Sequence, residues 1–362
     1  MDGRKLTEES ACRLVVLPKG SACALFAWDG LEAHEIGYVP AGGLSNFVFD
    51  SANRWMAHVQ PLSSVIGFWR VSHSEPPEKI GESSVPKGMK VQDAAVADGR
   101  LYVGTSGWRT GEGALIHRPI SERDTPWSRV EFPEPADGLQ TRVGAVFAES
   151  GRLTVADGSS STWFYRTLDV SEPAEPTLVR SVEIDKFSGT EYIRAAAVSG
   201  DVLILCTDDL LSSRPSSFIR CVDRRSFEEF AVLEYAIPLG PDGFEKDKSA
   251  LPLDVALSTR HLFVARSDAG VDITDLEELR AVQGARSDAD DRVVPFPGRA
   301  VVEQHRHRGT LPYYSVPKST PQLRHDTPVK KVFTVGDDPG CFAVHQAEGT
   351  SSQWEWIDDR TV

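Results

Sequence analysis

Ala95-Val-Ala-Asp-Gly-Arg-Leu-Tyr-Val103 is a short strand of small residues, a tight turn and a second strand with bulkier side chains. The same pattern returns at 47–55, 145–155, 196–204 and 256–264. Roughly fifty residues separate most of the copies, which is the range expected when one supersecondary unit repeats along a chain. Repeated short hairpins predict an all-β propeller, whose blades are antiparallel meanders packed face to face around an axis.

The repeats place the units near 44–86, 89–136, 139–187, 190–238 and 251–290, with an irregular sixth unit near 292–335. Two pieces are then left over, 12–40 at the N-terminus and 340–358 at the C-terminus, and neither has enough predicted strands to form a complete blade alone. We expect them to share one blade, because this would close the ring and remove open sheet edges. The prediction is a single domain over residues 1–362 with seven blades of four strands, and six or eight blades are the alternatives.

The second half of some units also repeats. Trp69-Arg-Val-Ser-His-Ser-Glu-Pro-Pro-Glu-Lys-Ile-Gly-Glu-Ser83 and Leu168-Asp-Val-Ser-Glu-Pro-Ala-Glu-Pro-Thr-Leu-Val-Arg-Ser181 share a strand, a proline-containing turn and another strand. They resemble the LVIVD-type β-propeller repeat, and weaker echoes occur at 271–282 and 221–232. The resemblance implies the propeller fold and no particular activity, because propellers carry many unrelated functions.

Composition narrows the classes of partner. The chain has 362 residues, of which 40% are hydrophobic and 25% charged, as in ordinary globular proteins. Its 53 acidic and 39 basic residues give a net charge of -14, which opposes binding to nucleic acid or to anionic lipid. The N-terminus has no apolar leader, and no run is long enough to cross a bilayer. We therefore expect an acidic cytoplasmic protein, monomeric, with neither nucleic acid nor membrane as a partner. Five scattered cysteines without a Cys-x-x-Cys pair predict reduced thiols.

Charged residues in the predicted innermost strands are the first candidate site. Four such strands carry one charge each in a small, apolar setting, at Asp93, Arg142, Arg194 and Asp254. Together they could hold an anionic or zwitterionic small molecule on the axis. They could equally neutralise one another around a tunnel or form ordinary hydrogen bonds between blades, because strand alternation alone does not fix which residues face the axis.

Glu303, His305 and His307 are the second candidate set, since alternation would place all three on one face of a strand. A carboxylate and two imidazoles suit zinc or iron, and either histidine would also serve as a general acid or base. Successive residues on one face are nearly 7 Å apart, so Glu303 and His307 would chelate together only if the strand bulged. A solvated outer strand is the simpler interpretation. Four more histidines, in separate predicted strands, do not match the flanking sequences of the carotenoid-cleaving propellers: His58, His117, His261 and His345.

No nucleotide-binding or nucleophile motif accompanies these residues. The sequence contains no Gly-x-Gly-x-x-Gly, P-loop, Gly-x-Ser-x-Gly or His-Glu-x-x-His, so we expect no cofactor. The remaining functions are a binding module that presents its channel mouth to a small molecule or a protein, and an enzyme of lyase, isomerase or hydrolase type that uses the channel. A funnel with converging arginines and aspartates would favour the enzyme, and a flat apolar rim would favour protein binding.

Overall fold

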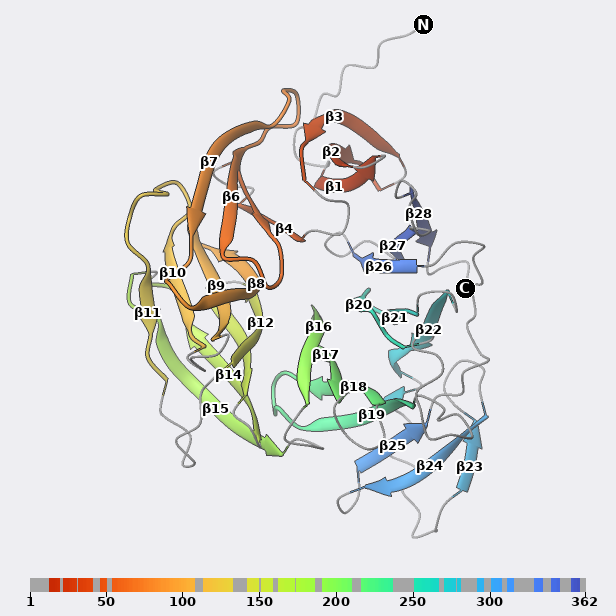
Figure 1. The fold of residues 1–362 in the computed structure, drawn as a ribbon. Coiled ribbons are helices and arrows are strands. Elements are labelled where there is room, and N and C mark those ends of the chain that lie inside the picture. Colours follow the sequence, from red (N-terminus) through yellow and green to blue (C-terminus); the bar gives the residue numbers. More distant parts are fainter. Residues whose placement is uncertain are drawn as a thin grey trace, which may run out of the picture.

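The protein is a seven-bladed β-propeller, nearly all β, in which the sheets surround a central axis (Figure 1). The computed structural model describes residues 13–19, 22–30, 32–41, 46–50, 54–107, 113–132, 142–149, 151–158, 162–172, 174–185, 191–209, 216–236, 251–266, 270–277, 279–280, 292–295, 301–307, 311–315, 329–334, 340–345 and 353–358.

The blades follow one another in chain order around the ring. Blade 1 consists of β1 (Arg13–Lys19), β2 (Ala22–Trp28) and β3 (Ala33–Val39). Blade 2 consists of β4 (Asn46–Asp50), β5 (Trp55–Val59), β6 (Val65–Arg70) and β7 (Glu78–Ser84). Blade 3 consists of β8 (Met89–Ala97), β9 (Arg100–Gly107), β10 (Leu115–Pro119) and β11 (Ser128–Val130). Blade 4 consists of β12 (Arg142–Glu149), β13 (Arg152–Gly158), β14 (Thr162–Asp169) and β15 (Thr177–Asp185).

The second half of the ring is less regular. Blade 5 consists of β16 (Tyr192–Ser199), β17 (Val202–Asp209), β18 (Ser216–Asp223) and β19 (Glu229–Ala236). Blade 6 has three described strands, β20 (Asp254–Leu257), β21 (His261–Ala265) and β22 (Val271–Asp275). Three further strands extend the sheet of blade 5 beyond β19: β23 (Arg292–Pro295), β24 (Val301–His307) and β25 (Leu311–Ser315). Blade 7 consists of β26 (Val329–Phe333), β27 (Gly340–His345) and β28 (Gln353–Asp358).

The repeated stretch forms the inner hairpin of a blade. In blade 3, β8 pairs with β9, and the turn between them has Asp98 at φ 46° and Gly99 at φ 73°. Two consecutive positive φ angles define the tight turn whose twist matches that of paired strands, and Asp-Gly is one of the dipeptides that adopts it most easily. The two LVIVD-like segments each cover the turn from the third to the fourth strand of a blade, from β6 to β7 and from β14 to β15.

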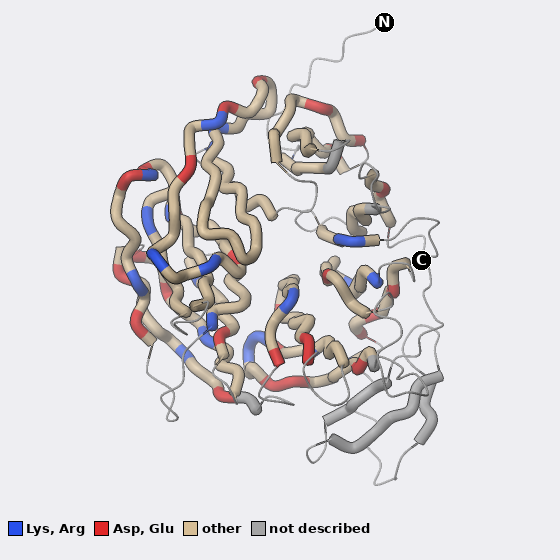
Figure 2. Tube along the Cα trace, viewed as in Figure 1, with Lys and Arg blue, Asp and Glu red and all other residues tan. Residues whose placement is uncertain are grey.

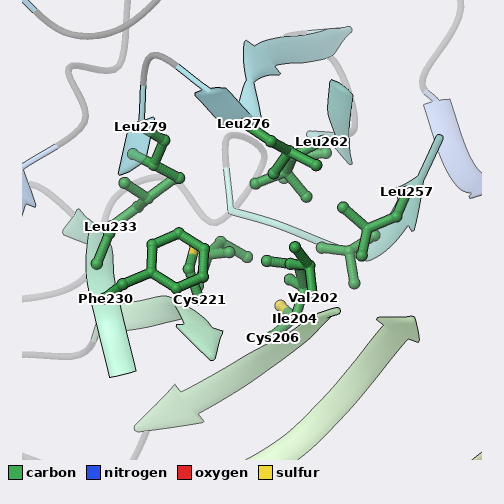
Figure 3. Close-up of a cluster of buried hydrophobic side chains, with 14 of the residues drawn as sticks. Val202, Ile204, Cys206, Cys221, Phe230, Leu233, Leu257, Leu262, Leu276 and Leu279 are labelled. Carbon is green, nitrogen blue, oxygen red and sulfur yellow. The ribbon is translucent and has the colours of Figure 1, made fainter. Parts of the chain in front are cut away.

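Neighbouring blades are held together by apolar faces. Between blades 5 and 6, Ile204 and Leu233 pack with Leu262 and Leu276, all of them nearly or completely buried (Figure 3). Similar clusters lie between other neighbouring blades. Because each blade buries its faces only against its two neighbours, the ring is stable only when closed.

Closure of the ring differs from the sequence prediction. Among the described residues the termini do not share a blade, because β1–β3 and β26–β28 form separate sheets. The two sheets instead pack face to face: the ring centroids of Trp28 and Phe342 lie 4.9 Å apart, and those of Trp28 and Trp356 also lie 4.9 Å apart. Aromatic side chains close the ring where a shared backbone ladder was predicted.

The predicted sixth unit, 292–335, is also wrong as one blade. Its strand β25 runs parallel to β19, with Val232 opposite Tyr313, whereas β26 pairs with β27 in the last blade. The strands at 292–315 are therefore an addition to blade 5, and the C-terminal piece gains β26 and becomes a blade by itself. Within the described residues, no helix is long and apolar enough to cross a membrane.

Candidate functional site

A cavity of about 940 Å³ lies on the axis, and the innermost strands of all seven blades contribute to its wall. The lining residues come from β1, β4, β8, β12, β16, β20 and β26, together with Thr334 directly after β26 and Arg54, Pro61 and 71–73 of blade 2. A volume of this size is typical of sites that enclose a small molecule. The centre of the propeller is thus the candidate site.

Bulges shape the wall near the start of several inner strands. The pairing register shifts between Val91 and Asp93 in β8 and between Ile193 and Ala195 in β16, and similar shifts occur in β12 and β26. A bulge leaves one residue outside the ladder and changes the direction of its side chain. In β8, β12 and β16 the extra residue lines the cavity: Gln92, Gly144 and Arg194.

Asp93 and Asp254 line the cavity and also join consecutive blades. The Val146 amide of blade 4 donates to Asp93 Oδ2 at 2.9 Å, and the Val332 amide of blade 7 donates to Asp254 Oδ2 at 3.2 Å. Burial raises the pKa of each carboxyl to about 6, although these amide hydrogen bonds and the charge of Lys331 act in the opposite direction. Both side chains therefore change charge close to neutral pH.

Arg194 lines the cavity and forms an ion pair with Asp208 of β17, a carboxylate with no exposed surface. Asp208 also accepts hydrogen bonds from the hydroxyls of Tyr192, at 3.2 Å, and Ser217, at 2.5 Å. Burial works to lower the pKa of Arg194, but the charge and hydrogen bond of Asp208 outweigh it, so the pKa lies above its usual value. The guanidinium is thus fixed at the cavity wall, with 28% of the side chain exposed.

The positive charge of Lys331 acts on both carboxylates and works to lower their pKa values. Its ammonium nitrogen Nζ lies 2.5 Å from Asn46 Oδ1, so the side chain links blades 7 and 2. Burial lowers the pKa of Lys331, while Asp254, Cys23 and Asp93 act to raise it. Figure 2 shows basic residues on β26 and at the end of β16 nearest the centre of the ring, and an acidic residue at the start of β20.

Three of the four predicted inner-strand residues therefore meet at the axis. Asp93, Arg194 and Asp254 line the cavity, whereas Arg142 is exposed at the first position of β12 and is not part of the wall. Arg194 pairs with Asp208 and not with either aspartate of the predicted ring. Basic side chains of the wall outnumber acidic ones, with Arg13, Arg54, Arg194 and Lys331 against Asp93 and Asp254.

Glu303, His305 and His307 lie on β24, with His305 opposite Tyr313. Their side chains are outside the described residues, so the predicted metal ligands and acid–base histidines stay predictions. The backbone places them in the extension of blade 5, beyond its outermost strand and not in an inner strand. Elsewhere in the described part of the chain, no three His, Cys, Asp or Glu side chains gather as metal ligands. His58, His117 and His261 lie outside the cavity wall, and the side chain of His345 is not described.

Sequence reasoning missed Lys331, Asn46, Arg13 and Asp208. The repeat spacing places Lys331 in a late strand of the predicted sixth unit, 292–335, and not in an innermost strand. The signal was present in Val329-Lys-Lys-Val-Phe-Thr-Val335, where a lysine interrupts an apolar strand. Asp208 had no such signal, because it lies on a second strand and reaches the site only through its partner Arg194.

No protein-family model and no curated protein sequence matches the chain. Among solved structures, it is similar to the dihydro-heme d1 dehydrogenase NirN in complex with DHE, with a TM-score of 0.52 and 14% identity over 99% of this chain. The chain spans 63% of the length of that protein. It is also similar to apo AztD from Citrobacter koseri, with a TM-score of 0.46 and 9% identity, covering 97% of this chain and 92% of that one. At such identities the first likeness supports the propeller fold alone.

Proposed function

We propose that the protein is a propeller binding module that holds a small anionic or zwitterionic molecule in its axial cavity. The observation that carries this proposal is a cavity of about 940 Å³ with four basic and two acidic side chains in its wall, in a chain whose net charge is -14. A basic cavity in an acidic protein concentrates anions locally, because low-dielectric walls focus the field of the lining charges.

The distribution of exposed apolar side chains favours a small molecule as the ligand over a protein partner. The exposed large hydrophobic side chains among the described residues are Tyr38 in blade 1, Leu62 and Val65 in blade 2 and Val179 in blade 4. They are scattered over three blades and form no contiguous apolar rim of the kind that marks protein interfaces. We also infer that the units are LVIVD-type repeats, on the strength of residues 69–83 and 168–181 and their common position between the third and fourth strands.

Calorimetry with a panel of small ions tests the binding proposal. A monocarboxylate, a dicarboxylate, a phosphate monoester and an amino acid are titrated against an amine of similar size. We expect at least one anion or zwitterion to bind, and the amine to bind more weakly. The double variant Arg13→Gln and Arg54→Gln should weaken binding about tenfold or more, since a hydrogen bond to a charged group contributes about 1.5–3 kcal/mol.

The control removes two exposed arginines that lie outside the cavity wall, Arg129→Gln and Arg152→Gln. This variant has the same change in net charge and should bind like the wild type. Equal weakening of binding in both double variants would show that the effect comes from the change in net charge and not from the cavity arginines. Absence of binding by every anion in the panel would overturn the proposal.

An enzyme is the second candidate function, and a specific feature favours it. Asp93 and Asp254, whose pKa values lie at about 6, share the cavity with Lys331, whose pKa is lowered by burial. Titratable groups with shifted pKa values are concentrated in catalytic sites, although structural ion networks shift them as well.

A further inference from the structure

The position of Lys331 in the cavity wall suits a lysine that acts as a nucleophile. It follows the bulge in β26, lines the axial cavity and has Nζ at 2.5 Å from Asn46 Oδ1, which limits its freedom of rotation. Two carboxylates share that cavity, and each is oriented by a backbone amide of the following blade. A lysine, a hydrogen-bonding amide and two carboxyl groups therefore line one cavity.

The charged and titratable groups that act on Lys331 are Asp254 of β20, Asp93 of β8 and Cys23 of β2. These groups favour its ammonium form, but burial opposes them and lowers the pKa of Lys331 below its usual value. A larger share of the amine is then neutral near pH 7 than in an exposed lysine. A buried lysine in this state is suited to attack carbonyl carbon.

We propose that Lys331 forms a reversible imine with a small carbonyl compound that carries an anionic group, of the 2-oxo acid class. This inference rests on the proposed binding of small anions in the same cavity. Arg13 and Arg194 would attract the carboxylate, while the carbonyl carbon is presented to Nζ of Lys331. The cavity volume of about 940 Å³ admits a molecule of this size together with water.

The chemistry needs no oxidant and no further reactant. The lone pair of Lys331 Nζ attacks the carbonyl carbon, the C–N bond forms, and the oxygen takes up a proton as the C=O double bond opens. A protonated carboxyl of Asp254 or Asp93 supplies this proton and then accepts one from the nitrogen. It gives that proton to the hydroxyl group and accepts the second nitrogen proton at the end, so the carboxyl is restored. Water then leaves as the C=N bond forms, so that the amine and the ketone give the imine and one water. Carboxyls with a pKa of about 6 are suited to these proton transfers near neutral pH.

Borohydride trapping of the whole protein tests the inference. The protein is incubated with pyruvate, reduced, digested and mapped by mass spectrometry, with the exposed Lys87 as the reference lysine. Because burial lowers the pKa of Lys331, a larger share of its amine is neutral than at the exposed Lys87, and trapping at Lys331 should exceed trapping at Lys87 several-fold. Lys331→Arg, which keeps the charge, should abolish the dominant adduct, whereas Lys87→Arg should leave it unchanged.

The measurement in the wild-type protein does not depend on folding of the variant, because the ratio of Lys331 to Lys87 adducts is read within one sample. Equal amounts of adduct at Lys331 and Lys87 would overturn the inference. Lactate separates this result from the proposed function, since it has the same carboxylate but no carbonyl group. If lactate and pyruvate both bind by calorimetry and no Lys331 adduct forms, the imine is wrong and anion binding stands. If neither lactate nor pyruvate binds and no adduct forms at Lys331, both the imine and the proposed anion binding are wrong.

Discussion

At the scale of residues, the axial charges serve the fold and the cavity at once. Asp93 and Asp254 connect neighbouring blades through backbone amides and still form part of the cavity wall. The two alternatives left open by the sequence, inter-blade hydrogen bonds or a ligand site, are therefore compatible for these carboxylates. Arg194 differs, because its partner is the fully buried Asp208 and not another residue of the predicted ring.

Arg194→Ala should destabilise the protein. The substitution leaves Asp208 buried with two hydroxyl donors but no cation, and loss of one partner from a buried ion pair costs about 3 kcal/mol. Arg142→Ala is the matched control, since Arg142 is exposed at a strand end, and should change stability by about 0.5 kcal/mol or less. Chemical denaturation of both variants measures the difference, and equal stabilities would show that the Asp208 pair does not support the fold.

At the scale of elements, the ring closes through side chains of its first and last blades. Trp28 of β2 contacts Phe342 of β27 and Trp356 of β28, and Phe342 has no exposed surface. In the part of the chain that the structure describes, the strand pairing stays within each of the two sheets. Closure is thus a matter of apolar packing between blades, as at the other blade interfaces.

Phe342→Ala should weaken this closure and destabilise the protein by about 3–5 kcal/mol, the usual loss for a buried phenylalanine. Tyr38→Ala removes an aromatic ring of blade 1 that is 53% exposed, and should have little effect. Thermal and denaturant unfolding compare the two variants. A Phe342→Ala protein as stable as the Tyr38→Ala protein would contradict closure by aromatic packing.

At the scale of the whole molecule, burial of carboxyl groups links stability to pH. Asp93, Asp157, Asp254 and Asp272 lie in three blades, and burial raises the pKa of each to about 6. Between pH 4 and 6 the folded protein therefore holds protons that the unfolded chain has released. Their contribution to stability is fully present below the unfolded pKa and is lost as pH rises through about 6.

Asp93→Asn should remove part of this pH dependence. The amide keeps an oxygen for the Val146 N–H but does not ionise, so the stability of the variant relative to wild type should rise by up to about 3 kcal/mol between pH 4 and 7. Glu82→Gln is the control, because the hydrogen bond and charge of Lys79 lower the pKa of this exposed carboxyl, and its relative stability should not rise with pH. Parallel curves for Asp93→Asn and wild type would contradict a raised pKa at Asp93.

The sequence by itself determined the propeller, because strand alternation, tight turns and repeat spacing are local patterns that can be read directly from the order of the residues. The inner-strand positions of Asp93, Arg194 and Asp254 could be predicted for the same reason, since a charge within a small, apolar strand is visible in the sequence, while their role in ligand binding stays a prediction. Only the tertiary structure decided that the termini form two blades, that β25 adds to blade 5, and that Lys331, Asn46 and Asp208 join the axial site. These depend on which surfaces meet across many tens of residues, and a pairing or packing partner at that separation leaves no periodic signal in the chain.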